Sequence, residues 1–301
     1  MTVEIISPAS RAGWLAQGLY RDIPAARYHA DDLCAVPTLS SSIASVLLSA
    51  SPRHAHLAHP RLNPHAKHVS TKVMDLGSVA HELVLGKGSG FCVATYNDYR
   101  TKTAQEWRDG VIARGAIPIK ESELSNAQEM ACFVERAVSE IPGAELAFNR
   151  GSAEVVAIWQ APDNGALCRA MIDWLDLENL VIYDLKTTSR RLEDRDLQSK
   201  IASGLDLQAA FYLRGLEHVM PDIAGRISWR WVFVECEAPF ELRVIELDAM
   251  TRAFGDRKVT RAIEIWERCM NTNEWPGYPR EISRLAYPAW AEAAWLEKEI
   301  A

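Results

Sequence analysis

Two aspartates and a lysine have the types and the spacing of a metal-dependent active site. Asp173 and Asp184 lie in two short apolar runs on either side of Glu178-Asn179, a pattern that predicts an antiparallel hairpin. With the turn centred on that pair, Asp173 lies directly opposite Asp184, with Cβ atoms roughly 5 Å apart. Lys186 joins the same face two residues further on. Carboxylates this close repel each other, whereas Mg²⁺ is commonly held by one or two of them, so the pattern favours a cation site.

A solvated sheet face is the ordinary alternative for aspartate and lysine at alternating positions of a strand. Such a face needs a hairpin whose other side chains also tolerate water. Here Trp174, Leu175 and Val181 make both strands too apolar for a fully exposed hairpin. The spacing alone nevertheless leaves both interpretations open.

A third acidic residue is expected beside the two aspartates. The β-rich run 153–161 ends in Pro162-Asp163-Asn164-Gly165, a strong turn signal. A turn centred between Asp163 and Asn164 places Glu154 opposite Asp173, so that three acids lie in a row across three neighbouring strands. Surface solubility gives no reason for such a row, but cation binding does.

His81 is a candidate ligand on a helix. Residues 72–86 have apolar side chains at helical spacing and end at Gly86, which predicts a helix. His81 borders the apolar stripe, and Gly77, one turn earlier, would let a substrate or another backbone approach the imidazole. A lone histidine beside an apolar stripe is more often a core residue, so the residue pattern leaves both roles open.

Length, composition and charge bound the class of protein. The 301 residues are 48% hydrophobic and include ten tryptophans, which predicts a single domain, 1–301, with a large core. No apolar run spans a bilayer and the first residues lack a signal-peptide core, which predicts a cytoplasmic protein. Six scattered cysteines without a C-x-x-C pair predict reduced thiols, and argue against a zinc ribbon or an iron–sulfur cluster. A net charge of −7 disfavours a general nucleic-acid coat protein but allows a local basic strip.

The hydrophobic pattern places the candidates on alternating helices and strands. Strands are expected at 153–161, 170–177, 180–185, 227–235 and 240–247, the last two joined around Ala238-Pro239. Helices are expected at 72–86, 125–141, 205–220 and 248–270, and a short one opens at 39–42 and runs through Leu48; the short helix has a serine N-cap, and the helix at 125–141 has a capping box of Ser125 and Gln128. The order from 125 to 235 is therefore α-β-β-β-α-β. An N-terminal elaboration (about 1–123) precedes this core (about 124–247), and a helix and tail (248–301) follow it.

Three further segments need an interpretation. Residues 53–68 hold five histidines whose spacings fit no tight metal site, so a solvated loop or phosphate-facing surface is expected. Residues 87–123 alternate short β-like pieces with basic and aromatic side chains, which suits contact with phosphates and bases as well as an ordinary amphipathic surface. The tail is expected to pin the C-terminus to the body through Trp275-Pro276-Gly277-Tyr278 and Tyr287-Pro288-Ala289-Trp290.

Short motifs follow one another along the chain at consistent spacing. They are L-S-S-S at 39–42, S-P at 51–52, G-S-V-A-H at 77–81, I-D at 172–173, D-L-K at 184–186, Q-A-A-F-Y at 208–212 and P-A-W at 288–290. In this order they resemble the PD-(D/E)XK nuclease superfamily, and more narrowly the phage-type exonuclease VIII family, which is similar to the lambda-type recombination exonucleases. The resemblance covers most of the chain from about residue 28. It implies an α/β (α+β) fold with a restriction-endonuclease-like core, a central mixed sheet flanked by helices.

The resemblance implies a metal site and a set of catalytic roles. Asp173 and Asp184 would ligate a catalytic Mg²⁺ or Mn²⁺, with His81 as a ligand carried on a helix. Lys186 would orient or polarise the attacking water and stabilise the charge developing on the phosphate. Glu154 joins the catalytic candidates through its strand register. The proline of the superfamily's PD is replaced by Ile172, a position that carries no chemistry.

The same resemblance implies a substrate and partners. Gln208 and Tyr212, four residues apart on one helix face, match a motif that positions the water or the scissile phosphate. The substrate implied is linear double-stranded DNA, digested from its ends, 5′→3′, by a ring-shaped homo-oligomer in phage-type recombination. A single-strand annealing protein is a further partner in this picture, and no membrane is involved. The candidate DNA-binding residues are Arg190, Arg191, Arg195 and Lys200.

Other classes of function remain open. One is a PD-(D/E)XK endonuclease, and another is a catalytically silent DNA-binding module of the same fold. The intact Asp173, Asp184 and Lys186 argue against the silent module. A metal-dependent hydrolase of small phosphates is a third alternative, which the lack of a glycine-rich nucleotide-binding loop disfavours.

Overall fold

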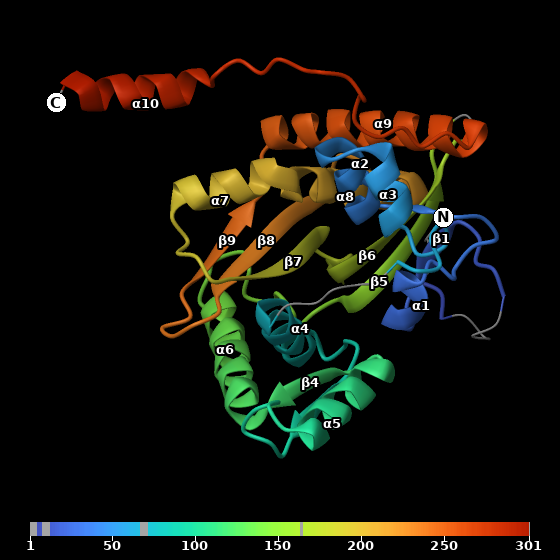
Figure 1. Cartoon of the computed structure of the whole chain (residues 1–301). Helices are drawn as coiled ribbons and strands as arrows, with labels where there is room; N and C mark the ends of the chain where they lie inside the picture. The colour runs from blue at the N-terminus through green and yellow to red at the C-terminus, as the bar shows by residue number, and fades with distance from the viewer. Residues whose placement is uncertain (1–4, 8–12, 67–71, 163–164, 301) are drawn as a thin grey trace.

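A seven-stranded mixed sheet forms the centre of the molecule, in a computed structural model that describes residues 5–7, 13–66, 72–162 and 165–300. The strand order is β1-β5-β6-β7-β8-β9, with β2 beside β6 (Figure 1). The mixed sheet flanked by helices confirms the fold class expected from the sequence. In the described part of the chain, no helix is long and apolar enough to cross a membrane. The strands are β1 (Gly18–Tyr20), β2 (Leu39–Ser40), β5 (Ser152–Gln160), β6 (Leu167–Asp176), β7 (Val181–Thr188), β8 (Ser228–Glu235) and β9 (Leu242–Glu246).

The two registers expected from the turn signals are present. β6 and β7 are antiparallel and pair Trp174 with Tyr183, which is the register of a turn centred between Glu178 and Asn179. β5 and β6 are antiparallel and pair Val155 with Ile172, again as expected. Of the turn between β5 and β6, residues 163–164 lie outside the described residues. Both strands bury consecutive residues on both faces, so the position of each turn sets the pairing.

β8 runs parallel to β7 because a helical crossover carries the chain back across the sheet. The crossover consists of α7 (Asp194–Lys200), a π-helical turn (Ile201–Leu205) and α8 (Asp206–Val219), and a short 3₁₀ turn (Pro221–Ile223) leads into β8. β9 then pairs antiparallel with β8, which confirms the expected second hairpin. The expected closing helix is α9 (Ala249–Thr272), whose N-cap Asp248 accepts hydrogen bonds from the backbone N–H groups of Met250 and Thr251.

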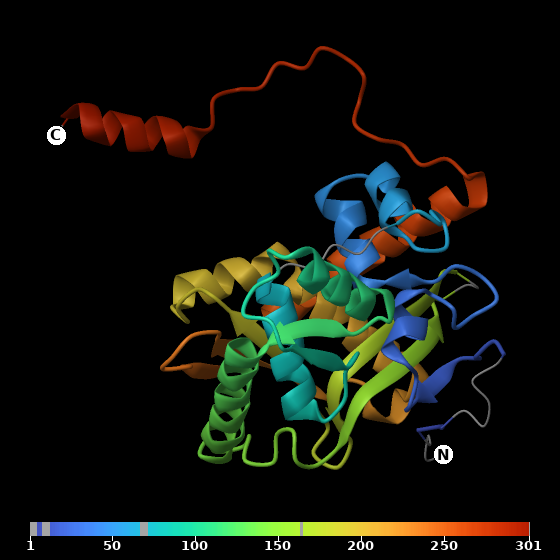
Figure 2. The ribbon, with the colours of Figure 1, turned by 60° about the horizontal axis from the view of Figure 1, so that its bottom comes forward.

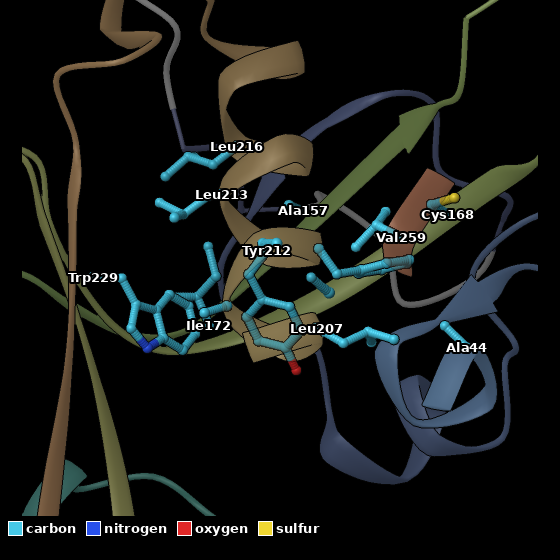
Figure 3. Packing of buried hydrophobic residues seen from close by; sticks show 14 of the residues in the cluster. Ala44, Ala157, Cys168, Ile172, Leu207, Tyr212, Leu213, Leu216, Trp229 and Val259 are labelled. Atoms are coloured by element: carbon cyan, nitrogen blue, oxygen red, sulfur yellow. The ribbon is translucent and has the colours of Figure 1, made fainter. Parts of the chain in front are cut away.

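Helices cover both faces of the sheet (Figure 1). On one face lie α8, α9, α2 (Ser41–Ser49) and α3 (Pro52–Ala58). Their core includes Tyr212, Leu213 and Leu216 of α8, and Trp229 of β8 (Figure 3). On the other face α4 (Lys72–Leu85) and α6 (Glu121–Ser139) pack against a second apolar cluster. The sheet is therefore buried on both sides, except where polar residues enter it.

Three expectations for the first half of the chain are wrong. The histidine-rich tract is helical in part, because Ser51-Pro52 begins α3 with proline at its first position rather than only ending α2. The segment 87–123 contains a helix, α5 (Lys102–Ala113), between two parallel strands, β3 (Phe91–Ala94) and β4 (Ile117–Lys120) (Figure 2). α6 starts four residues before Ser125, and its capping carboxylate is that of Glu123, which accepts from the Lys120 backbone N–H.

The C-terminal tail behaves in two ways. Trp275 packs edge-on against Trp266 and His56, and Arg53 donates its backbone N–H to the Pro276 carbonyl, as the expected pinning requires. The second aromatic-proline piece does not pack: Trp290 is 76% exposed. It opens α10 (Ala289–Ile300), which projects away from the body in both views (Figures 1 and 2). That part of the expectation is therefore wrong.

Candidate active site

The sheet splits between β6 and β7 at the position of the two aspartates. The two strands pair only from Trp174 opposite Tyr183 to the turn. One position further on, the Asp173 carboxylate accepts a hydrogen bond from the Leu185 backbone N–H at 3.2 Å. A side-chain oxygen thus takes the place of a strand carbonyl. The strand pairing keeps the expected register up to Trp174 and Tyr183, but Asp173 and Asp184 are not paired in the ladder as expected, because it ends one position before them.

Asp184 and Lys186 form an ion pair on β7, in which the aspartate is buried and the lysine is half-buried. The Asp184 carboxylate is inaccessible to solvent, and its Oδ2 lies 2.6 Å from the Lys186 ammonium. Burial raises the pKa of Asp184 to about 7, although Lys186 opposes that rise. Burial lowers the pKa of Lys186, but the Asp184 and Asp173 carboxylates outweigh it and raise that pKa overall. Asp184 therefore lies where negative charge is poorly compensated, which suits a site for a cation.

His81 reaches Asp173 from the other face of the sheet. Its Nε2 lies 3.1 Å from Asp173 Oδ2. Burial lowers the pKa of His81, but the nearby Asp173 carboxylate has the larger effect, so the pKa of His81 is raised overall. Burial raises the pKa of Asp173, but the nearby His81 has the larger effect, so the pKa of Asp173 is lowered overall. Gly77 allows the approach that the sequence suggested, since a Cβ at this position would lie 2.5 Å from Thr187 Oγ1. α4 thus packs directly on β7, and a core histidine without a polar partner is excluded.

Glu154 lies opposite Asp173, between the ladder pairs of β5 and β6 on either side of it. Its backbone is left-handed, with φ of 51°, which interrupts the regular strand. Burial raises the pKa of the Glu154 carboxyl, and His81 opposes that rise. The side chain lines a pocket of about 580 Å³ between the end of α4 and the loop 86–90. Glu154 therefore borders the site beside His81.

Gln208 and Tyr212 reach the site from α8. Gln208 Nε2 donates a hydrogen bond to Asp184 Oδ1 at 3.2 Å. Burial raises the pKa of Tyr212 to about 12, opposed by contacts of its hydroxyl with Ser41 and Gln208. Its ring packs edge-on against Trp229, with centroids 5.7 Å apart (Figure 3). Ser41, the first residue of α2, was not identified as a site residue from the sequence, although the L-S-S-S motif contained it.

The candidate DNA-binding residues lie beyond the end of β7. Arg190, Arg191 and Arg195 are exposed. Lys200 is half-buried and donates to Thr188 Oγ1 at 2.6 Å, and burial lowers its pKa. The three arginines can therefore contact a ligand directly, whereas Lys200 is engaged within the protein.

The aromatic and histidine-rich segments are occupied by internal packing. In the first, Tyr99 stacks on Trp107 and the Arg108 guanidinium lies 5.7 Å from the Tyr99 ring. In the second, His59 is fully buried and its Nε2 lies 3.3 Å from Asp31 Oδ2. His54 packs on Tyr278 and His56 on Trp275, His65 is exposed, and His68 lies outside the described residues. The expected solvated or phosphate-facing surface is therefore wrong for His59, which is buried, whereas His54 is exposed.

The donor set fits a hard or borderline divalent cation. Two carboxylates (Asp173 and Asp184) lie on the two strands that part at the split, and the His81 imidazole contacts one of them; oxygen ligands suit Mg²⁺, while an added imidazole suits Mn²⁺. The buried Asp184 carboxyl, with its raised pKa, is the group that a cation would stabilise in its ionised form. Within the described ranges, no three His, Cys, Asp or Glu side chains are grouped closely enough to hold a metal ion by themselves. Instead, the Asp173 carboxylate contacts His81 and the Asp184 carboxylate contacts Lys186.

Comparison with known proteins gives a family and a fold. A family model described as a PDDEXK-like domain of unknown function (DUF3799) matches residues 42–285, well over half of the chain. The chain is similar to a proposed exonuclease from Eubacterium rectale, with a TM-score of 0.56 and 11% identity over 91% of this chain and 99% of that one. A phage-related exonuclease from Haemophilus somnus matches with a TM-score of 0.29 and 11% identity over 69% of this chain and 98% of that one. No curated protein matches the sequence.

Proposed function

The chain belongs to the PDDEXK-like family, and on that premise we propose that it is a metal-dependent nuclease that hydrolyses phosphodiester bonds of DNA. The observation that carries the proposal is the Asp184–Lys186 pair at the split of the sheet, with Asp173 on the adjoining strand. Metal-dependent phosphodiester hydrolysis needs carboxylates that hold a cation and a separate positive charge near the phosphate. Asp173 and Asp184 are such carboxylates, and the Lys186 ammonium group, which cannot ligate a cation, is such a charge. Asp173, Asp184 and His81 are the proposed ligands.

We assign each side chain a role that its contacts support. A Mg²⁺ or Mn²⁺ ion held by Asp173 and Asp184 would supply Lewis acidity and stabilise the charge that builds on the phosphate. Lys186 supplies a fixed positive charge beside the buried Asp184 carboxylate, where it can stabilise negative charge that develops on the phosphate. Gln208 keeps Asp184 oriented by donating to Oδ1, and His81 does the same for Asp173. Tyr212 and Glu154 complete the walls of the site.

The finer proposal is an exodeoxyribonuclease that acts on linear duplex DNA from its ends, 5′→3′, in phage-type recombination in the cytoplasm. A chain with a net charge of −7 has little general affinity for DNA, so sustained digestion needs a local basic surface or an enclosing ring of subunits. The exposed Arg190, Arg191 and Arg195 directly beyond the active-site strand support a local surface. A single-strand annealing protein would receive the 3′ strand that this polarity leaves.

Digestion of three substrates tests the proposal. Linear duplex, covalently closed circular duplex and a small phosphodiester are each incubated with Mg²⁺, Mn²⁺ or EDTA, and light scattering measures the mass of the assembly. We expect loss of the linear duplex alone, with Mg²⁺ or Mn²⁺ only, from an oligomer. Equal cutting of linear and circular DNA by a monomer would replace the exonuclease with an endonuclease, and DNA binding without cleavage would leave a silent module. Cleavage of the small phosphodiester alone would overturn DNA as the substrate.

A further inference from the structure

The geometry points to Lys258 as a positioning residue that holds the first turn of α8 where Gln208 can reach Asp184. Lys258 lies in α9, which packs along α8 (Figure 1). The kinetic part of this inference rests on the proposed nuclease function. Its structural part does not, because it concerns only the orientation of the Gln208 side chain in the protein.

The first turn of α8 follows a break in the helical path. The chain enters it from the π-helical turn Ile201–Leu205, in which Gly204 has a φ of 146°, a value that only glycine adopts without strain. The residue at the N-cap is Leu205, whose side chain makes no capping hydrogen bond. Gln208 lies in this first turn, so its orientation depends on the contacts that hold the turn from outside.

Lys258 binds the chain on both sides of this break. Its ammonium group donates to the Ala202 carbonyl at 3.0 Å, before Gly204, and to the Asp206 carboxylate at 2.5 Å, after it. The Asp206 side chain is only 5% exposed, and a buried carboxylate needs such a partner. Its other oxygen accepts from the Leu207 backbone N–H at 2.7 Å. One side chain of α9 therefore fixes both the π-helical turn and the start of α8.

The backbone of α9 also contacts this turn. A Cβ on Gly255 would overlap the Asp206 carbonyl and would lie 2.8 Å from the Ala210 Cβ, too close for a side chain to fit. Gly255 and Lys258 are three residues apart and therefore lie on one face of α9. Because the helices touch at the glycine, the lysine beside it can reach Asp206 and hold the turn in one place.

Gln208 links the position of this turn to the active site. It lies two residues after Asp206, and at about 3.6 residues per turn the two side chains leave the helix in roughly opposite directions. Asp206 therefore faces α9, while Gln208 faces the sheet and donates from Nε2 to Asp184 Oδ1 at 3.2 Å. A glutamine amide has a donor end and an acceptor end, and only its donor end stabilises an ionised carboxylate. A turn that is free to shift would weaken this bond although Gln208 itself is unchanged.

Lys258→Met tests the inference, because it removes the ammonium group and keeps most of the apolar stem. Arg252→Met is the matched control: the Arg252–Glu217 ion pair, at 2.7 Å, joins the same two helices near the other end of α8. In Lys258→Met we expect kcat on linear duplex DNA to fall about two- to tenfold, the effect of weakening one hydrogen bond, with KM unchanged. Arg252→Met should keep both constants, since a general loosening of the two helices would affect both variants alike.

Two further measurements show whether Lys258 acts through Gln208. In the Gln208→Ala background, Lys258→Met should cause no further loss of kcat. The second measurement does not depend on activity: the side-chain amide resonance of Gln208 is assigned in a ¹⁵N-labelled sample by its absence from Gln208→Ala. We expect this resonance to move in Lys258→Met and to stay in Arg252→Met.

Three results would overturn the positioning role: an unmoved Gln208 resonance in Lys258→Met, an equal loss of kcat in Arg252→Met, or additive losses in the double variant. A rise in KM alone in Lys258→Met would also overturn it and make Lys258 a contact for DNA. A wild-type protein without nuclease activity would overturn the proposed function instead, and the resonance would still decide the role of Lys258.

Discussion

The Asp173 carboxylate accepts a hydrogen bond from the Leu185 backbone N–H across the point where β6 and β7 part. This bond closes the sheet where the strand ladder has ended, and it directs one acid of the site toward the strand that carries the other. The same acid is bound by His81 from the opposite face. Asp173 thus joins three elements, β6, β7 and α4, at the candidate active site.

Loss of either acid should abolish cleavage without unfolding the protein. Asp184→Asn and Asp173→Asn keep the shape of the side chains and one acceptor oxygen but remove the charge that holds a cation. We expect both variants to be folded by circular dichroism and inactive on linear duplex DNA. Asp109→Asn, at an exposed position of α5, serves as the control and should be fully active. Normal cleavage by either site variant would remove that acid from the metal site.

Lys186→Ala should separate catalysis from metal binding. The ammonium group cannot ligate a cation, and in the metal-free protein it occupies Asp184 Oδ2. We expect kcat to fall by about 10²- to 10³-fold, the usual effect of removing one fixed charge at a transition state. Mn²⁺ affinity, measured by calorimetry, should be retained or increased. A variant that loses Mn²⁺ binding in parallel with activity would contradict this assignment.

His81 should make metal affinity depend on pH. Asp173 raises the pKa of His81 above its ordinary value of 6.5, so the imidazole keeps its proton to higher pH than an ordinary histidine does. A ligand must be unprotonated, and Mn²⁺ affinity should therefore rise as pH increases above 6.5. His81→Gln should weaken Mn²⁺ binding and flatten this dependence, as followed by calorimetry at several pH values. Unchanged affinity in His81→Gln would leave the histidine a structural partner of Asp173.

The metal-free protein should lose stability as pH rises from 5 to 8. The pKa of Asp184 rises from 3.8 to about 7 in the folded state, so the fold binds that proton more tightly than the unfolded chain does. Its contribution is present at low pH and is lost as pH increases toward 7, and the raised pKa of His81 acts in the same direction. Melting temperatures in EDTA should fall over this range, and less so in Asp184→Asn. Mg²⁺ should restore stability most at pH 8.

Gly77→Ala should displace α4. The added Cβ would lie 2.5 Å from Thr187 Oγ1, so we expect a loss of about 1–3 kcal/mol of stability and weaker Mn²⁺ binding as His81 moves. Adding Thr187→Ala removes the clashing oxygen and should restore most of both losses. Gly110→Ala, on α5 with only Arg114 Nη1 at 3.7 Å, is the control and should be neutral or slightly stabilising. Chemical denaturation measures all three variants.

The candidate site could be predicted from the sequence because two hairpins position its residues. The end of the β6–β7 ladder could not, because it depends on which group pairs with a backbone N–H. Turn signals fixed the registers of β5, β6 and β7, which placed Glu154 and Asp173 correctly. The same signals could not show that the ladder ends before Asp184, because that depends on a side-chain acceptor for Leu185. α5 was missed because its polar sequence buries only Ala104 and Val111 and gives a weak helical stripe.

The pairing of β7 with β8 gives the site an intrinsic optical reporter. Asp184 is the register partner of Trp231, a tryptophan only 1% exposed whose ring contacts that of Trp229. The emission wavelength of an indole responds to charges fixed beside it, and the charge at Asp184 is the one that a cation or a proton changes. Fluorescence of the unlabelled protein should therefore follow occupation of the site, with Trp231→Phe abolishing the response. Ligand binding could then be timed in a stopped-flow instrument, before any bond in DNA is cut.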